Sequence, residues 1–340
     1  MAAVIYWAIE KFCHSVTMEK EREHQSEIFH DSWRRLSWVE KQIDATRQLA
    51  QPLIELPTHA ALTTTIHEDS VRPGYLEFSA EVAKPPMPPE DINFLIGNIV
   101  TDARSCLDMA MEQIWNAYSI DRTMGKKGTL TVQFPLEDNF EDRRNKNERL
   151  RQFLARMDKR FVEVIENAQP NYAGGLFDIP CNISAILIRN FSNANKHRNI
   201  TPVVTHQRLL VTVTNVAGLS LKSLDGDERE GVPPLRFSLD YDTDQHSEAD
   251  ARFYVARLNQ PRAAPLVVSV SQRLLVAGDE VPIYPPHLGG QKVSWRAELD
   301  ELLEKIPAYV RLTLRNLNRV HGIIRRGEDE FYLLDRDGTL

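Results

Sequence analysis

The stretch that decides this fold is Gly97-Asn98-Ile99-Val100-Thr101-Asp102-Ala103-Arg104-Ser105-Cys106-Leu107-Asp108-Met109. Apolar side chains recur in it every three or four residues, and the same pattern predicts one amphipathic helix over residues 91–118. Charged side chains lie among the residues that should face a core. Buried charges cost free energy unless they find partners. We therefore expect this helix to carry either a structural polar network or a binding site.

A second stretch of the same kind is Arg189-Asn190-Phe191-Ser192-Asn193-Ala194-Asn195-Lys196-His197-Arg198-Asn199. Arg189, Asn193 and His197 are spaced by four, so they share one helix face, as do Arg104 and Asp108 on the first helix. If the two faces meet, they form a network of Arg, Asp, Asn and His side chains. Such a network either fixes the packing of the helices or holds phosphate and moves a proton through His197.

Hydrophobic periodicity divides the rest of the chain into helices and strands. Helical spacing predicts further helices at residues 19–50, 145–168, 180–198 and 295–326, the first ended by Pro52 and Pro57 and the last bent at Pro307. Alternating or β-prone runs predict strands at residues 62–66, 75–82, 130–134, 209–213, 235–239, 251–258, 265–270 and 331–334. Core candidates on the helix at 91–118 are Phe94, Ile96, Ile99, Val100, Leu107, Ile114 and Trp115.

These elements predict an α+β fold: a helical bundle with an inserted β-hairpin, followed by a β-rich domain and a returning C-terminal helix. We expect residues 1–90 to hold the long first helix, the hairpin and a Pro-rich connector. Residues 91–205 would form the helical core and residues 206–294 the β-rich domain. Residues 295–340 would supply the last helix and a short strand.

Composition excludes several classes of protein. The chain has 340 residues and a net charge of −7, which argues against a generally basic surface for nucleic acid, although residues 143–160 are rich in Arg and Lys. No apolar run is long enough to span a membrane. Residues 1–17 do not match a signal peptide well, and an alternative is that they are an extension from an upstream start codon. Three scattered cysteines fit a reduced, cytoplasmic protein. The histidines lack metal-ligand spacing, so we expect neither metal nor cofactor.

The order of several short motifs resembles a group of uncharacterised bacterial proteins. The pieces that carry the resemblance are Gly97-Asn98, Arg104-Ser105-Cys106-Leu107-Asp108, Gln133-Phe134-Pro135, Gln169-Pro170-Asn171-Tyr172 and Asn193-Ala194-Asn195-Lys196-His197-Arg198. The group has the patterns Gly-Asp-x-x-His-Asn-x-Arg-Ser-Ala-Leu-Asp-His and Asn-x-x-Lys-His-Arg at these places. The resemblance covers residues 20–205 and implies a helical core similar to HEPN (higher eukaryotes and prokaryotes nucleotide-binding) domains. Many of those domains are metal-independent ribonucleases that use an Arg and a His on one helix.

The chain departs from this pattern at positions that matter for catalysis. Asn98 stands in place of the group's Asp, and Met109 stands in place of its final His. The resemblance therefore implies that the first helix has lost its general acid/base, so that catalysis would need His197 from the facing helix. Arg315 and His321 form another Arg/His pair with the spacing of HEPN ribonucleases, in a stretch that equally fits the basic end of a helix.

The leading hypothesis is a HEPN-like binding module whose polar pocket between helices takes a nucleotide, RNA or a similar anionic ligand. The residues expected to hold and orient phosphate are Arg104, Arg189, Lys196 and Arg198, with Asp108 and Asn193. One alternative is a metal-independent endoribonuclease of a toxin or defence system, in which His197 with Asp108, or His321 with Arg315, does the chemistry. The other is a non-catalytic scaffold. Whether the chain is an enzyme, and whether it forms a homo-oligomer, stays open at this level.

Overall fold

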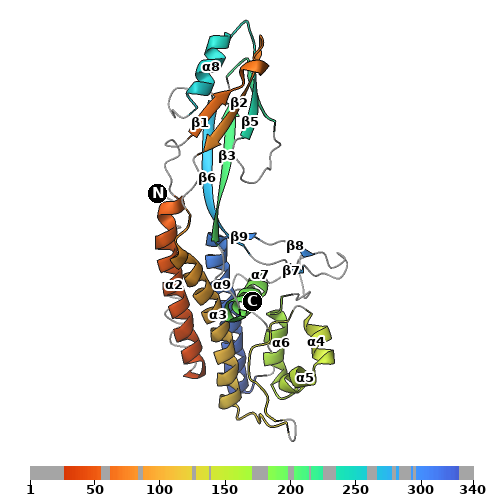
Figure 1. Cartoon of the computed structure of the whole chain (residues 1–340). Helices are drawn as coiled ribbons and strands as arrows, with labels where there is room; N and C mark the ends of the chain where they lie inside the picture. Colours follow the sequence, from red (N-terminus) through yellow and green to blue (C-terminus); the bar gives the residue numbers. More distant parts are fainter. Residues whose placement is uncertain are drawn as a thin grey trace, which may run out of the picture.

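The computed structural model describes residues 27–54, 62–82, 87–124, 128–137, 139–170, 183–197, 203–213, 216–224, 235–258, 266–277, 281–282, 292–293 and 296–328. It confirms the predicted α+β class, with a helical bundle and a returning C-terminal helix. The described part of the chain is elongated: the helices occupy one end, and a sheet covered by one helix occupies the other (Figure 1). Within this part, no helix combines the length and the apolar character that a membrane span requires.

Four helices build the bundle. They are α2 (His30–Ile54, preceded by the 3₁₀ turn η1 at Glu27–Phe29), α3 (Glu90–Ala117), α7 (Ile183–His197) and α9 (Leu299–Arg326). Helix α3 packs against the other three, and its apolar stripe is fully buried from Ile92 to Trp115. The prediction that Phe94 belongs to the core is wrong, because half of the surface of this residue is exposed. The first helix also runs through Pro52 instead of ending there.

The predicted helix at 145–168 is wrong as a single element, because the chain forms three short helices. These are α4 (Phe140–Lys146), α5 (Glu148–Ala155) and α6 (Lys159–Asn167). Asn147 and Asp158 accept hydrogen bonds from the first N–H groups of α5 and α6, so each acts as an N-cap that starts a new helix. The strand predicted at 130–134 is also wrong. Alternate residues there are buried, but the segment joins no strand ladder formed by the described residues.

A four-stranded antiparallel sheet forms the other end of the molecule, in the order β1–β2–β5–β4. Its strands are β1 (Leu62–Ile66), β2 (Tyr75–Val82), β5 (Leu235–Tyr241) and β4 (Leu219–Ser223). The predicted hairpin is confirmed, with Leu62 opposite Val82 and Ile66 opposite Phe78. Because β2 also pairs with β5, the hairpin and the later strands share one sheet. The division of the chain into domains remains a prediction.

Helix α8 (Glu248–Ala256) covers this sheet, so the strand predicted at 251–258 is wrong. Ser247 and Asp250 form a capping box, which starts a helix where the alternating apolar residues indicated a strand. A second apolar core lies between α8 and the sheet. It includes Leu76, Phe78, Phe237, Leu239, Ala251 and Val255.

A long antiparallel ribbon, β3 (Val203–Val213) paired with β6 (Leu266–Ala277), connects the two ends. Leu266 belongs to the core under the sheet, whereas Val203 and Val276 belong to the core of the helices. The short strand β9 (Arg296–Glu298) pairs with the lower end of β6 and leads directly into α9. Two further strands, β7 (Val281–Pro282) and β8 (Lys292–Val293), pair with each other. The strand predicted at 331–334 lies outside the described residues.

Candidate functional site

Arg104 and Asp108 on α3 both form hydrogen bonds with the backbone of Phe134. The two side chains form an i,i+4 ion pair with Arg104 Nε 3.3 Å from Asp108 Oδ1. Arg104 Nη2 donates to the carbonyl oxygen of Phe134, and Asp108 Oδ1 accepts from its N–H at 2.9 Å. Both side chains are mostly buried, with 14% and 22% of their surfaces exposed. The pair therefore satisfies both polar groups of one peptide residue, while the Phe134 ring fills the core.

Gln169 holds the same extended segment from the side of α6. Its Nε2 donates to the carbonyl of Pro135 at 2.9 Å, and its Oε1 accepts from the N–H of Glu137 at 3.0 Å. Gln169 is almost completely buried. The Gln-Phe-Pro and Gln-Pro motifs of the sequence are thus brought together, since the backbone of Phe134, Pro135 and Glu137 is hydrogen-bonded by side chains of α3 and by Gln169, just after α6.

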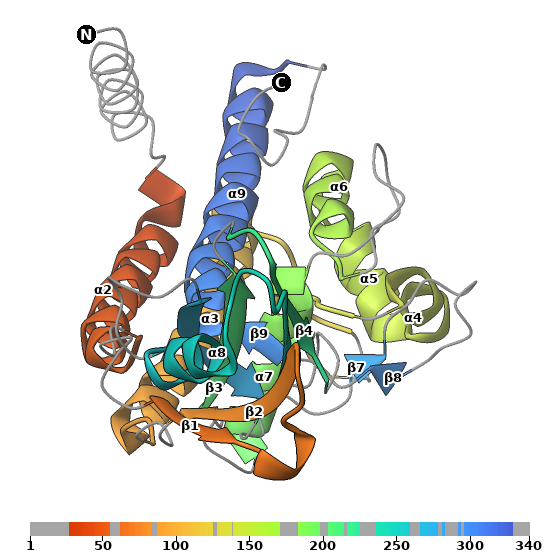
Figure 2. The same ribbon diagram turned by 90° about the horizontal axis from the view of Figure 1, so that it is seen from above.

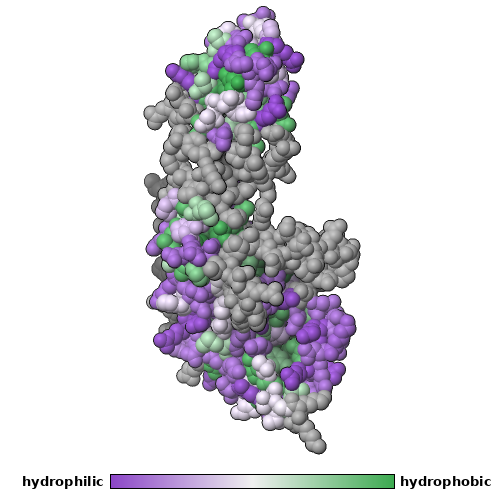
Figure 3. Space-filling view, in the orientation of Figure 1, coloured by the Kyte–Doolittle hydropathy of each residue, from purple (hydrophilic) through white to green (hydrophobic). Residues whose placement is uncertain are grey.

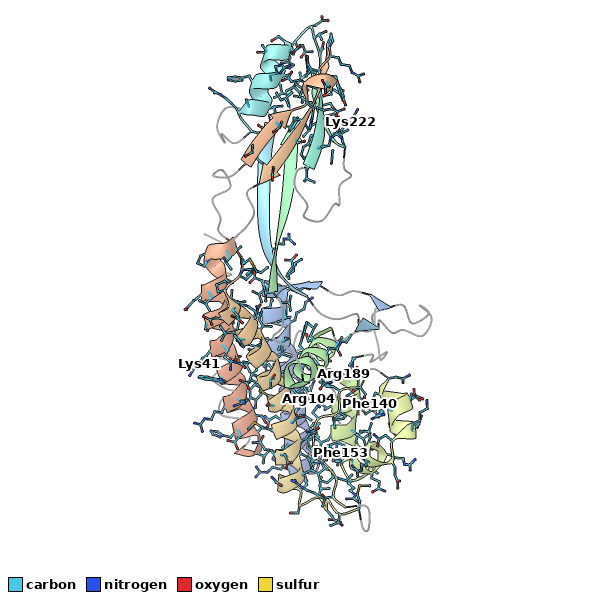
Figure 4. All side chains as sticks on the ribbon, viewed as in Figure 1. Lys41, Arg104, Phe140, Phe153, Arg189 and Lys222 are labelled. Atoms are coloured by element: carbon cyan, nitrogen blue, oxygen red, sulfur yellow. The ribbon has the colours of Figure 1, made fainter. Side chains whose placement is uncertain are left out.

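Arg189 on α7 lies close enough to Arg104 for their charges to interact (Figure 4). Burial lowers the pKa of the Arg189 guanidinium, the nearby carboxylate of Glu137 opposes this shift, and the positive charge of Arg104 adds to it. The site therefore brings two arginines and one acid together in a partly desolvated position. Glu137 Oε1 also lies 3.8 Å from Arg143 Nε in the middle of α4.

Tyr309 brings α9 to the same site. Its hydroxyl donates to the carbonyl of Ala168 at 2.7 Å, directly before Gln169. Burial raises the pKa of this hydroxyl, and the charge of Arg104 acts against that shift. The site consequently lies where α3, α7 and α9 meet, with the segment at 130–137 across it. We call Arg104, Asp108, Glu137, Arg189 and Tyr309 the arginine site.

The predicted site residues are only partly brought together. Arg104, Asp108 and Arg189 gather as expected, although Asp108 binds a backbone N–H group as well as an arginine. Asn193 is exposed. Lys196 and His197 end α7, but their side chains are not among those that the structure describes, and Arg198 lies outside the described residues. Their proposed roles stay predictions.

His321, the alternative catalytic residue, lies in a different place. It is 94% buried at the far end of α9, where its Nδ1 hydrogen-bonds the hydroxyl of Tyr118 at 2.9 Å and its ring packs edge-on against Phe29. Burial lowers the pKa of His321, and the charge of Arg325 lowers it further. Arg315 lies on α9 with an intermediate exposure. This environment favours a structural role for His321, because a general base must reach a substrate proton.

Three parts of the site could not be found from the sequence patterns used. Glu137 and Tyr309 belong to segments whose own patterns indicate only a loop and a core helix, and the backbone of Phe134 carries no side-chain signal at all. The nearest available clue was the pair of motifs Gln133-Phe134-Pro135 and Gln169-Pro170.

The surroundings of the site are polar, and they contain no metal centre that the described residues could form. Hydrophilic side chains cover the surface over α4 and α5, next to the site (Figure 3). Among the described residues, no group of three or more His, Cys, Asp or Glu side chains is arranged to hold an ion. Comparison with known proteins found no matching family model, no similar curated protein and no similar solved structure.

Proposed function

We propose that this chain is a binding protein whose arginine site holds a phosphate group of a nucleotide or of an RNA. The observation that carries the proposal is the approach of Arg104 and Arg189 from two different helices in a partly buried position. The HEPN-like character of the helical core remains part of this proposal.

The physical argument rests on the desolvation of a guanidinium beside a second cation. The loss of water is the largest effect that disfavours the charged form of Arg189, and the positive charge of Arg104 adds to it. The carboxylate of Glu137 offsets these effects only in part. An anion with two negative charges would favour the charged form further, and arginine binds phosphate through two parallel hydrogen bonds, which gives strength and orientation.

Asp108 acts in this proposal as a positioning residue. Its carboxylate fixes the guanidinium of Arg104 from one side, while the carbonyl of Phe134 fixes it from another. An arginine held in this way loses less side-chain entropy when it binds a ligand. The residues of the site bind and position a ligand in this proposal, and none of them transfers a proton. The proposed function is therefore binding and not catalysis.

A structural scaffold is the second candidate, and one observation favours it. Arg104, Asp108 and Gln169 together hydrogen-bond the backbone of Phe134, Pro135 and Glu137, which is sufficient reason to keep these polar side chains inside the bundle. The two functions differ at Arg189, because only the phosphate proposal requires its guanidinium to bind a ligand.

Isothermal titration calorimetry of the full chain can separate the two candidates. Inorganic phosphate, ADP and an eight-nucleotide RNA would be titrated separately. We expect Arg189→Gln to weaken the tightest of these interactions by at least tenfold. Arg34→Gln, on the exposed surface of α2, is the matched control and should leave it unchanged. Circular dichroism would verify the fold of each variant, and Arg189→Lys keeps the charge should Arg189→Gln unfold.

The outcome of that titration decides between the candidates. Binding that is lost in Arg189→Gln and weakened in Arg189→Lys supports phosphate recognition, since lysine lacks the planar fork of arginine. If none of the three compounds binds the folded wild-type chain, the phosphate proposal is rejected and the scaffold stands.

A further inference from the structure

Helices α2 and α3 lie side by side and form an outer face of the bundle. They run antiparallel, because Ser32 hydrogen-bonds Gln113 near one end and Gln42 hydrogen-bonds Asp102 further along. Both views place α2 on one side of α9 and the short helices α4, α5 and α6 on the other, so the short helices do not cover α2 (Figures 1 and 2). We call the solvent-facing surface of these two helices the α2–α3 face.

Large apolar side chains are exposed on this face. Trp38 and Leu49 of α2 expose 53% and 39% of their surfaces, and Phe94 of α3 exposes 50%. Trp38, Ala45 and Leu49 lie on one side of α2, since they are separated by seven and four residues. A single exposed apolar side chain needs no explanation, but several on one surface mark a place where another molecule binds.

The open side of α3 carries no unpaired charge between Asp91 and Glu112. The charged residues in this interval are Asp102, Arg104 and Asp108. All three form ion pairs and are mostly buried. The outer side of a helix on a protein surface normally carries charged residues. Because charged residues are depleted at the centre of protein interfaces, this neutral side is suited to contact another protein.

The residues along the neutral side have the same order of sizes in both directions. They are Phe94, Asn98, Thr101, Ser105 and Met109, with a large apolar residue at each end and smaller polar residues between them. If α3 crosses α3 of a second copy in the antiparallel direction at Thr101, each Phe94 meets the partner's Met109. Each Asn98 then meets the partner's Ser105, and the smaller side chains let the helices approach closely. A surface that is complementary to itself in this way fits a two-fold dimer.

The same two-fold axis makes α2 complementary to itself. The hydrogen bonds between α2 and α3 fix the register of the two helices. From that register, an antiparallel crossing at Thr101 places Trp38 over the small side chain of the partner's Ala45. It also places Lys41 opposite the partner's Asp44. Lys41 and Asp44 are exposed, and neither forms an ion pair with another residue of the part that the structure describes.

We propose that the α2–α3 face is the contact surface of a two-fold homodimer, in which α3 crosses α3 of the partner subunit at Thr101. Two helices that are each about 10 Å wide and about 30 Å long offer about 600 Å² on each subunit. The dimer would bury about 1,200 Å² in total, which is at the lower end of the range for stable interfaces, so we expect it to be reversible. The arginine site lies on another side of α3, towards α7 (Figure 4), and the proposal is independent of it.

Sedimentation velocity of the full chain over a hundredfold range of concentration tests the proposal. We expect a monomer–dimer equilibrium that Lys41→Glu weakens at least tenfold, because two acidic side chains would then lie opposite each other. Asp44→Lys should weaken it as much by placing two lysines opposite each other. An equimolar mixture of these two variants should dimerise, since both contacts again join opposite charges. Arg151→Glu makes an equal change of charge on the exposed surface of α5 and should leave the equilibrium unchanged.

A disulfide cross-link tests the position of the two-fold axis. In a Cys13→Ser/Cys181→Ser background, Thr101→Cys should form a covalent dimer on oxidation. Ala155→Cys, exposed on α5, is the matched control and should stay monomeric. Circular dichroism would verify the fold of each variant.

Three results would overturn the proposal. The first is a wild-type chain that stays monomeric at every concentration. The second is a dimer that Lys41→Glu and Asp44→Lys leave unchanged, because another surface would then mediate it. The third is a mixture of these two folded variants that dimerises no better than either variant alone. Arg189→Gln should leave the equilibrium unchanged, so failure of the arginine site and failure of the dimer are distinguishable.

Discussion

Asp108 Oδ1 accepts a hydrogen bond of 2.9 Å from the N–H of Phe134, although 26 residues separate them in the chain. The same carboxylate forms an ion pair with Nε of Arg104, and Nη2 of Arg104 donates to the carbonyl of Phe134. One ion pair therefore anchors an extended segment that pairs with none of the strands in the described part of the chain.

Removing this anchor should destabilise the fold. We expect Asp108→Ala to lower the free energy of unfolding by about 2–3 kcal/mol, because it leaves a buried N–H group without an acceptor and Arg104 without a counter-charge. Asp108→Asn should cost less, since the amide oxygen can still accept from Phe134. Urea denaturation measures both. Asp44→Ala, on the exposed side of α2, is the control and should have little effect; an equal loss in both alanine variants would show that the anchor contributes nothing.

His321 should make stability depend on pH. Burial holds its pKa below the unfolded value of about 6.5. The unfolded chain then binds more protons than the folded chain, so the contribution of His321 is fully present above that value and is lost as the pH falls through the folded pKa. We expect the free energy of unfolding to fall less steeply between pH 7 and 5 in His321→Gln than in the wild type.

The control for that experiment is His30→Gln, because the His30 side chain is 74% exposed. It should reproduce the wild-type pH dependence. Tyr118→Phe, which removes the hydrogen bond to His321 Nδ1, should cost about 1 kcal/mol at pH 7. A pH slope that is the same in His321→Gln and in the wild type would contradict the assignment.

Cys106 should be chemically inert in the folded protein. It is completely buried, and burial raises the pKa of its thiol to about 12. The thiolate is the reactive form, so modification should require unfolding. In a Cys13→Ser/Cys181→Ser background, we expect no reaction with a thiol reagent at pH 8 over minutes, and prompt reaction in urea. Reaction of the native protein at the rate of a free thiol would show that the α2–α3 interface opens readily.

Gly74 closes the hairpin between β1 and β2 with a φ of +77°. A Cβ atom there would lie 3.1 Å from the carbonyl oxygen of Tyr241. We expect Gly74→Ala to cost about 1–2 kcal/mol from the left-handed backbone alone, plus the crowding. Gly128 has a φ of +91° but open space around it, so Gly128→Ala measures the backbone cost by itself. Equal losses in the two variants would show that the crowding at Gly74 is relieved.

The fold was predictable where a pattern persisted over many residues. Helices α3 and α9 each maintain an apolar stripe for 28 residues, and both were expected at nearly their true bounds. Short patterns failed because two structures fit them equally well. Ala251, Phe253 and Val255 alternate as in a strand, but the capping box at Ser247 makes them a helix. Around Asn147 and Asp158, helical periodicity continued across two caps that break the helix.

The sequence predicted only those parts of the site that are formed by side chains. The spacing of Arg104 and Asp108, and the position of Arg189, can be seen in the sequence. Their common partner cannot, because it is the backbone of Phe134, and any residue has the same N–H and C=O groups. The approach of Tyr309 depends on how α9 returns to the bundle, which is a long-range property of the fold.

The pairing of β2 with β5 has a consequence for the order of folding during synthesis. The strand β2 cannot pair until β5 has been made, and the residues of β5 leave the ribosome about 160 positions later. All segments of the sheet core have been made once Leu266 has appeared, whereas the helical core is still missing α9. The sheet end can therefore fold first, while α2, α3 and α7 expose apolar surface until the last helix arrives. This interval is when the nascent chain has most need of a chaperone.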